Sequence, residues 1–415
     1  MHPFTLLFVI VVAGGLAVEL WLLGRQLRAV RAHRDRVPAP FAAAVTAEDH
    51  ARAADYTIAQ ARFAMAERVY GVLLLVALTL AGGLAALDAR VSATGVTGLS
   101  RQVAVIAAVM LVISVAGLPF DLWRTFRIEA RHGFNRTTPG LFAADVFKSL
   151  AIGALLMLPL VGLVLWLMAR AGTAWWIWAF GAWAAFSILL GWAWPRVFAP
   201  LFNRFRELEP GILRDGVEAL ARRCGFEPRG VFVMDGSKRS THGNAYFTGL
   251  GRHKRIVFFD TLLDALAIEE LQAVLAHELG HFRLRHVSLR LALSLAAAFA
   301  GFALLAWLGQ QPWFQPALGV PAGGPHTLLL LFVLTAPVFL LPLRPLSAWF
   351  SRRHEFAADR FAAQHASAGA LADALVKLYR DNATTLTPDP LYAAFHASHP
   401  PALARIARLA PERAG

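Results

Sequence analysis

The chain alternates between long apolar stretches and arginine-rich polar stretches, and this alternation predicts its architecture. Apolar stretches long enough to cross a bilayer as helices cover residues 4–24, 70–87, 103–120, 149–169, 174–195, 288–309 and 327–348. The first has neither a basic start nor a small-residue cleavage site, so we expect a retained helix rather than a signal peptide. The pattern therefore predicts an all-α multispan membrane protein with seven transmembrane helices.

The distribution of arginine predicts how the chain is oriented. The connections at 25–69, 121–148 and 196–287, together with the tail from Arg344, are rich in arginine, whereas the stretch 310–325 carries no charge. Because basic loops stay in the cytoplasm, we expect the N-terminus outside and the C-terminus in the cytosol.

The membrane interpretation changes how the net charge is understood. The 415 residues carry a formal charge of +13, which could indicate a nucleic-acid partner, but 57% of them are hydrophobic and only 16% are charged. That composition excludes a soluble enzyme and a disordered chain. We therefore expect a lipid bilayer and no nucleic acid as partner. The heavy use of alanine and arginine hints at a bacterium, hence a cytoplasmic membrane, with the endoplasmic reticulum as the eukaryotic alternative. The single cysteine, Cys224, leaves no intrachain disulfide.

The same pattern predicts four segments. They are 1–195 with five membrane helices, 196–287 as a cytosolic segment, 288–348 with two membrane helices, and 349–415 as a second cytosolic segment.

The first cytosolic segment combines strands with a helix. Short strands are predicted at Val231–Met234 and Arg255–Asp260, and extended chain is predicted at Asn244–Leu250. A helix should follow from about Ala267.

That helix carries an H-E-x-x-H motif from His277 to His281. Residues four apart share one helix face, so both imidazoles can reach one metal ion, and zinc accepts them while keeping a position open for water. Glu278 would then take a proton from that water. The alternative is two unrelated histidines on a helix.

A third ligand is available after the last membrane span. Glu355 and Asp359 are also four residues apart, so Glu355 can ligate the zinc while Asp359 accepts a hydrogen bond from a ligand imidazole. The alternative is an acidic helix face paired with neighbouring arginines.

Taken with these two motifs, the chain resembles the type I CAAX prenyl endopeptidases, a family of sterile-24-like integral-membrane zinc metalloproteases. The resemblance runs from the first span to about Arg405, and the further stretches that carry it are Ile128–Asn135, Pro200–Asn203, Asp235–Ser240, Asn244–Phe247 and Ser398–Pro401.

The resemblance implies a helix barrel around a water-filled chamber, closed at its cytosolic end by the zinc protease domain. It implies one zinc ion, held by His277, His281 and Glu355, and cleavage near the C-terminus of prenylated tails. It also implies that Asn244 and Tyr246 belong to a substrate-binding edge strand. His399 and Arg405 would steady the oxyanion and the substrate near the zinc, a role their donors can perform.

Two further residues stand out. His286 follows the motif but does not share its helix face, so we expect it to be structural rather than a ligand. Glu19 lies inside the first span, where an acid is costly, so it should face the chamber or reach the interface.

Three functions are compatible with these features. The first is the CAAX-type zinc endopeptidase, and the second is a membrane-protein quality-control protease without a prenyl requirement. The third is a transporter or channel with a decayed site, which the complete set of ligand residues disfavours.

Overall fold

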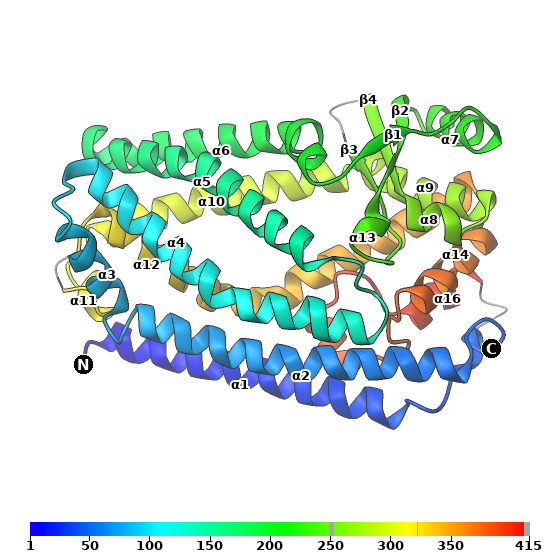
Figure 1. Ribbon diagram of the computed structural model, residues 1–415, viewed down its shortest axis with the longest axis horizontal. Coiled ribbons are helices and arrows are strands. Elements are labelled where there is room, and N and C mark those ends of the chain that lie inside the picture. The colour runs from blue at the N-terminus through cyan, green and yellow to red at the C-terminus, as the bar shows by residue number, and fades with distance from the viewer. Residues whose placement is uncertain (249–252, 322, 411–415) are drawn as a thin grey trace.

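Long helices form the walls of an elongated molecule, and a small sheet with short helices closes one end (Figure 1). The structure is a computed structural model that describes residues 1–248, 253–321 and 323–410. The wall helices are α1 (Pro3–Ala32), α2 (Ala47–Leu78), α3 (Gly83–Ser92), α4 (Gly98–Trp123), α5 (Pro139–Arg170), α6 (Trp175–Ala193), α10 (His286–Gly309), α12 (Pro325–Leu340) and α13 (Arg344–His365). A short α11 (Phe314–Ala317) precedes α12.

The membrane spans agree with the predicted number once the second is recognised as bent. Six helical segments of the described chain are long and apolar enough to cross a bilayer, and α2 with α3 makes a seventh after a 52° bend. The bend follows Leu78, and Gly82 adopts a φ of 77° that favours glycine. The fold class predicted from the sequence is confirmed.

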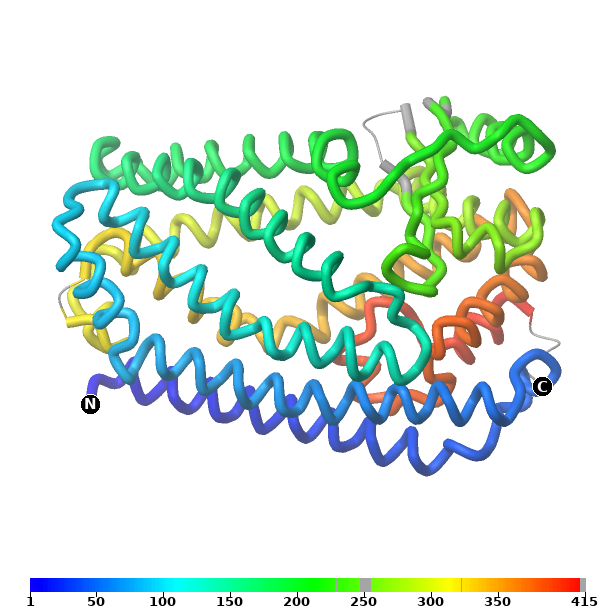
Figure 2. The backbone as a smooth tube through the Cα atoms, in the orientation of Figure 1, coloured from blue at the N-terminus to red at the C-terminus, as the bar shows by residue number. Residues whose placement is uncertain are grey.

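The helices differ from the predicted apolar stretches in two places. The connection 25–69 is mostly helix, because α1 continues to Ala32 and α2 starts at Ala47, so the arginines lie on helical extensions. The last span is broken by a 3₁₀ turn at Leu341–Leu343, where Pro342 and Pro345 interrupt the pattern before α13. Figure 2 shows α1 and α2 running side by side.

The sheet has the strand order β1-β2-β4-β3. Its strands are β1 (Phe205–Glu207), β2 (Glu227–Met234), β3 (Ala245–Thr248) and β4 (His253–Phe259). β2 and β4 are parallel, whereas β1 and β3 pair antiparallel on the outside. The three extended segments predicted from the sequence are strands, β1 was not foreseen, and residues 249–250 of the predicted extended segment lie outside the described residues. β3 therefore has one free edge in the described sheet.

Short helices pack around the sheet. They are α7 (Ile212–Arg223), α8 (Asp260–Ala265), α9 (Ile268–Arg283), α14 (Ala368–Asp381), α15 (Pro390–His396) and α16 (Ala402–Leu409). One apolar core joins α7, α9 and α14 to the sheet, through fully buried residues such as Leu220, Phe258 and Leu275. A second core around Phe8, Leu165 and Phe314 ties the wall helices together at the opposite end.

Candidate metal centre

The centre is built where α9 crosses α13. Glu270 accepts a hydrogen bond from the backbone amide of Ala267 at 2.8 Å, which starts α9 at the predicted residue. Gly280 lets the helices approach closely, because a Cβ there would lie 3.2 Å from Phe361 Cβ and 3.3 Å from Ala358 Cα. The H-E-x-x-H face of α9 and the Glu355–Asp359 face of α13 therefore oppose each other.

Three ligand atoms converge between these helices. The Nε2 atoms of His277 and His281 are 3.3 Å apart, and the Glu355 carboxylate oxygens lie 3.4 Å from His277 Nε2 and 3.3 Å from His281 Nε2. A tetrahedral zinc ion with bonds of about 2.0–2.1 Å holds its ligands about 3.3 Å apart. Glu355 Oε2 is buried and has no hydrogen-bond partner in the described chain, so a cation would satisfy it. The donor set fits zinc.

A second layer of contacts orients the two histidines. His277 Nδ1 lies 2.9 Å from Asp359, and Arg405 Nε donates to Asp359 at 2.9 Å. His281 Nδ1 lies 3.1 Å from His286 Nδ1, and His286 stacks on His354. His286 therefore lies beside the centre, as the hydrogen-bond partner of the candidate ligand His281. The five-residue offset suggested another helix face, but the chain breaks between α9 and α10 at Arg285, with a φ of 60°, and this turn returns His286 to the site.

The surroundings favour positive charge at the centre. Burial opposes protonation of His277, but its hydrogen bonds to Asp359 and Glu355 outweigh burial and raise the pKa of His277 to about 9.

Arg405 is only 5% exposed. The family resemblance placed Arg405 near the zinc, and the packing of α16 against α13 adds its buried ion pair with Asp359.

Glu278 faces a cavity of about 350 Å³ beside the ligands. His277, Asn244, His399 and Arg405 line the same cavity. His399 Nε2 is 3.5 Å from Glu355 Oε2. Burial lowers the pKa of His399. The structure thus brings together eight of the nine residues predicted for the site.

The ninth, Tyr246, lies on β3 but does not line this cavity in the described chain. Its ring packs edge-on against Phe259, 6.3 Å between centroids, and burial raises the pKa of its hydroxyl. Asn244, immediately before β3, is exposed, and its carbonyl accepts the amide of Phe259 at 3.0 Å. The edge strand begins at the cavity, as the sequence implied.

Loops that carried the family resemblance fasten this end of the molecule to the wall helices. Arg239 donates to Asp145 of α5 at 2.8 Å and to Asn203 at 2.7 Å. Asn135 forms a β-bridge with Ser240. These residues had no chemical role in the sequence analysis, and their contacts give them a structural one.

Comparisons with known proteins agree with this architecture. Residues 26–204 match the family described as CAAX prenyl protease N-terminal, five membrane helices, and residues 207–413 match Peptidase family M48. The chain is 37% identical over 319 residues to the CAAX prenyl protease 1 homolog of Oryza sativa subsp. japonica, covering 74% of this chain and 73% of that protein. It is 34% identical to the Homo sapiens homolog over 71% of this chain and 70% of that protein.

The likeness extends to three dimensions. The crystal structure of S. mikatae Ste24p matches with a TM-score of 0.91 and 27% identity, covering 99% of both chains. The resemblance stated from the sequence motifs is confirmed. The chain is a multispan membrane protein and a metalloendopeptidase, and it belongs to peptidase family M48, in the branch of the CAAX prenyl proteases.

Proposed function

We propose that the protein is a zinc endopeptidase that cleaves near the C-terminus of CAAX-type, prenylated tails on the cytosolic side of the membrane. The observation that carries the proposal is the convergence of His277, His281 and Glu355 beside Glu278 in one cavity. The relatives named above as CAAX prenyl proteases support the substrate class.

His277, His281 and Glu355 would hold one zinc ion, and zinc bound there supplies a Lewis acid and an activated water. Asp359 accepts the Nδ1 hydrogen of His277 and so keeps Nε2 free for the metal. His281 donates from Nδ1 to His286, which leaves its own Nε2 free in the same way. Arg405 neutralises Asp359 and fixes it against α16.

Glu278 is the general base in this proposal. It follows a ligand histidine on α9 and is half-buried in the cavity rather than in the ligand set. Its carboxylate takes a proton from the attacking water and later delivers it to the leaving amine. Removing that base should cost on the order of 10²–10⁴ in turnover.

Substrate binding uses the free edge of β3. A peptide can add to this edge through main-chain hydrogen bonds, and the exposed amide of Asn244 can donate and accept beside it. His399, close to the ligands, donates to the oxyanion that develops on the scissile carbonyl. Tyr246 would support the strand through its packing on Phe259 rather than by touching the peptide at the cavity.

The decisive experiment compares Glu278→Gln with the wild-type protein, both loaded with zinc in lipid nanodiscs. The variant should keep one zinc per chain and lose nearly all cleavage of a farnesylated peptide, whereas His281→Ala should lose the zinc itself. Near-normal turnover by zinc-loaded Glu278→Gln would contradict the role of Glu278.

The substrate class needs its own comparison. The same peptide without its farnesyl group should be cleaved much more slowly. Equal cleavage of both peptides would favour a quality-control protease with no prenyl requirement.

Orientation is tested separately. The N-terminus is proposed to lie outside and the C-terminus in the cytosol, because basic connections stay in the cytoplasm. A reporter that works only outside the membrane, fused after residue 415, should stay silent. Activity of that fusion would reverse the orientation.

A further inference from the structure

A second cavity, of about 930 Å³, reaches the candidate metal centre and shares no lining residue with the cavity of Glu278. The two cavities meet at the centre: Ser398 lines the large one and its neighbour His399 lines the small one. On α13, His354 lines the large cavity directly beside the candidate ligand Glu355. A peptide bound across the centre can therefore extend into both cavities.

The large cavity carries unbalanced positive charge. Arg68, Arg290 and Arg344 line it, and none of its lining residues is acidic. Behind it lies Glu19, which Arg344 approaches to 2.7 Å and Arg68 to 3.5 Å. The three arginines and Glu19 together leave a surplus of positive charge in this cavity, which an anionic ligand would balance.

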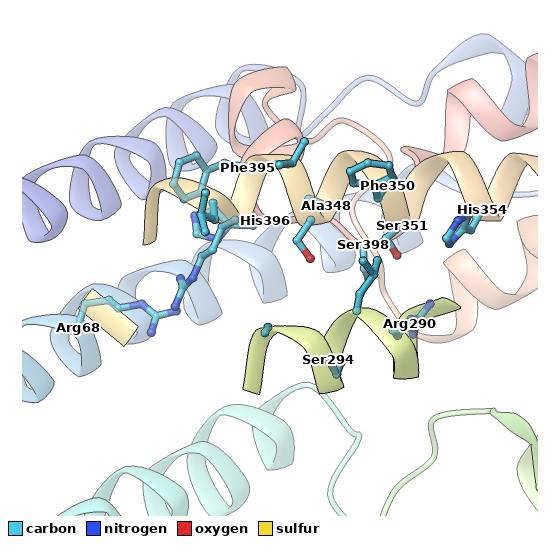
Figure 3. Close-up of a pocket in the computed structure, with 16 residues that line it drawn as sticks. Arg68, Arg290, Ser294, Ala348, Phe350, Ser351, His354, Phe395, His396 and Ser398 are labelled. Atoms are coloured by element: carbon cyan, nitrogen blue, oxygen red, sulfur yellow. The ribbon is translucent and has the colours of Figure 1, made fainter. Parts of the chain in front are cut away.

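Arg290 is the least compensated of the three. It lies on α10, is exposed, and has no ion pair or hydrogen bond in the part of the chain that the structure describes. Figure 3 shows Arg290 near Ser398 and His354, whereas Arg68 and His396 lie at the far end of the cavity. The free guanidinium is therefore the one nearest the metal centre.

The rest of the lining is apolar. Leu293, Leu343, Leu346, Phe350 and Phe395 surround the arginines. The smaller cavity, in contrast, combines leucines such as Leu371 and Leu375 with the catalytic side chains. A peptide end with aliphatic side chains and a terminal carboxylate would match the larger cavity. Its side chains would contact the apolar residues, and arginine pairs with a carboxylate through two parallel hydrogen bonds.

We infer that the large cavity binds the C-terminal side of the scissile bond and that Arg290 recognises the free α-carboxylate at the end of the substrate tail. The inference rests on the proposed function and adds a reason why the enzyme would act near chain ends. A terminal carboxylate held at a fixed distance from the metal restricts which peptide bond reaches Glu278.

Binding without turnover tests this. Zinc-loaded Glu278→Gln protein in phosphatidylcholine nanodiscs is titrated with an aliphatic tripeptide labelled at its amino end, as the free acid and as the C-terminal amide. The acid should bind at least about tenfold more tightly. Adding Arg290→Gln should lower the affinity for the acid to that for the amide, and Arg290→Lys should keep part of the preference for the acid. Arg353 is an exposed arginine outside this cavity, so Arg353→Gln should keep the full preference.

Equal binding of acid and amide, or loss of the preference in Arg353→Gln, overturns the inference. So does a preference that disappears in nanodiscs containing phosphatidylglycerol, since a lipid phosphate would then be the occupant. Cleavage by the wild type is measured in parallel. Absence of cleavage with an intact acid preference would refute the proposed function and leave the carboxylate site standing.

Discussion

The metal centre and the membrane wall are held together by opposite means. At the centre, Glu355, Asp359 and Arg405 are each at most 5% exposed and contact one another or the candidate ligands. In the wall, only 6% of the most apolar stretch of the α6 segment is buried within the protein. The wall ion pair between Arg124 and Glu67 has both side chains more than a third exposed.

The difference indicates where each region draws its stability. The centre depends on internal packing and on a buried polar network, so single changes there should be severe. The wall faces lipid on one side and borders cavities on the other, so it should tolerate substitutions. Its stability should depend on the lipid or detergent that surrounds it. Paired substitutions, one in each region, can break this comparison.

The largest contrast should come from arginine. Arg405→Gln leaves the Asp359 carboxylate buried without its cation and should destabilise the protein by about 3–5 kcal/mol. Arg124→Gln removes a half-exposed pair and should cost less than about 1 kcal/mol. Thermal unfolding in one fixed detergent measures both. Similar shifts of the two midpoints would mean that the centre is no more tightly coupled than the wall.

Glycine gives the next contrast. Gly280→Leu forces a side chain against Phe361 and Ala358 and should cost about 1–3 kcal/mol. It should also reduce bound zinc, because α9 and α13 carry the ligands. Gly153→Leu, on α5, meets nothing within 4 Å and should leave both properties unchanged. Metal analysis after gel filtration gives the answer, and full zinc occupancy in Gly280→Leu would count against tight packing.

The third contrast concerns a single hydrogen bond. His286→Ala removes the partner of His281 Nδ1 and should weaken zinc binding by about 10–100-fold without preventing folding. His365→Ala serves as the control, since that ring contacts the backbone of Phe361 and no candidate ligand. Competition with a zinc chelator measures both affinities; an unchanged affinity in His286→Ala would make this residue a packing element only.

The smallest effect lies at the junction of the two regions, where His242 is 3.7 Å from Glu129. The nearby Glu129 carboxylate raises the pKa of His242 above its ordinary value of 6.5. The resulting stabilisation, under about 1 kcal/mol, is complete below pH 6.5 and is lost as the pH rises through the raised pKa. Midpoints for the wild type and His242→Gln should therefore differ most below pH 6.5 and converge as the pH rises through the raised pKa. A gap that widens with pH would reverse the sign and exclude this pair.

The convergence of the candidate ligands could be predicted in part, because both motifs repeat at four residues, so one helical turn brings each pair onto one face whatever the rest of the fold does. Helix α9 starts where its acidic first turn predicted. The roles of Arg405 and His286 could not be predicted in this way. Their partners, Asp359 and His281, become neighbours only through the docking of α16 and the turn at Arg285, and local periodicity does not encode either.

The bent second span marks the limit of hydropathy. The stretch 70–87 is apolar throughout, yet the helix stops at Leu78 and resumes at Gly83. At this break Gly319 lies against the backbone of Thr79. A Cβ atom on residue 319 would lie only 2.3 Å from the Thr79 carbonyl oxygen. Such a long-range contact leaves no trace in a hydropathy window.

The order of the metal-centre residues along the chain has a consequence for biosynthesis. His277 and His281 precede the last two membrane spans, Glu355 and Asp359 lie on the helix that ends them, and Arg405 follows on α16. A chain that ends before Glu355 lacks one of the three candidate metal ligands. With these residues holding the metal as proposed, activity would arise only after the membrane helices have been synthesised, so an unfinished chain would not cleave its neighbours in the membrane.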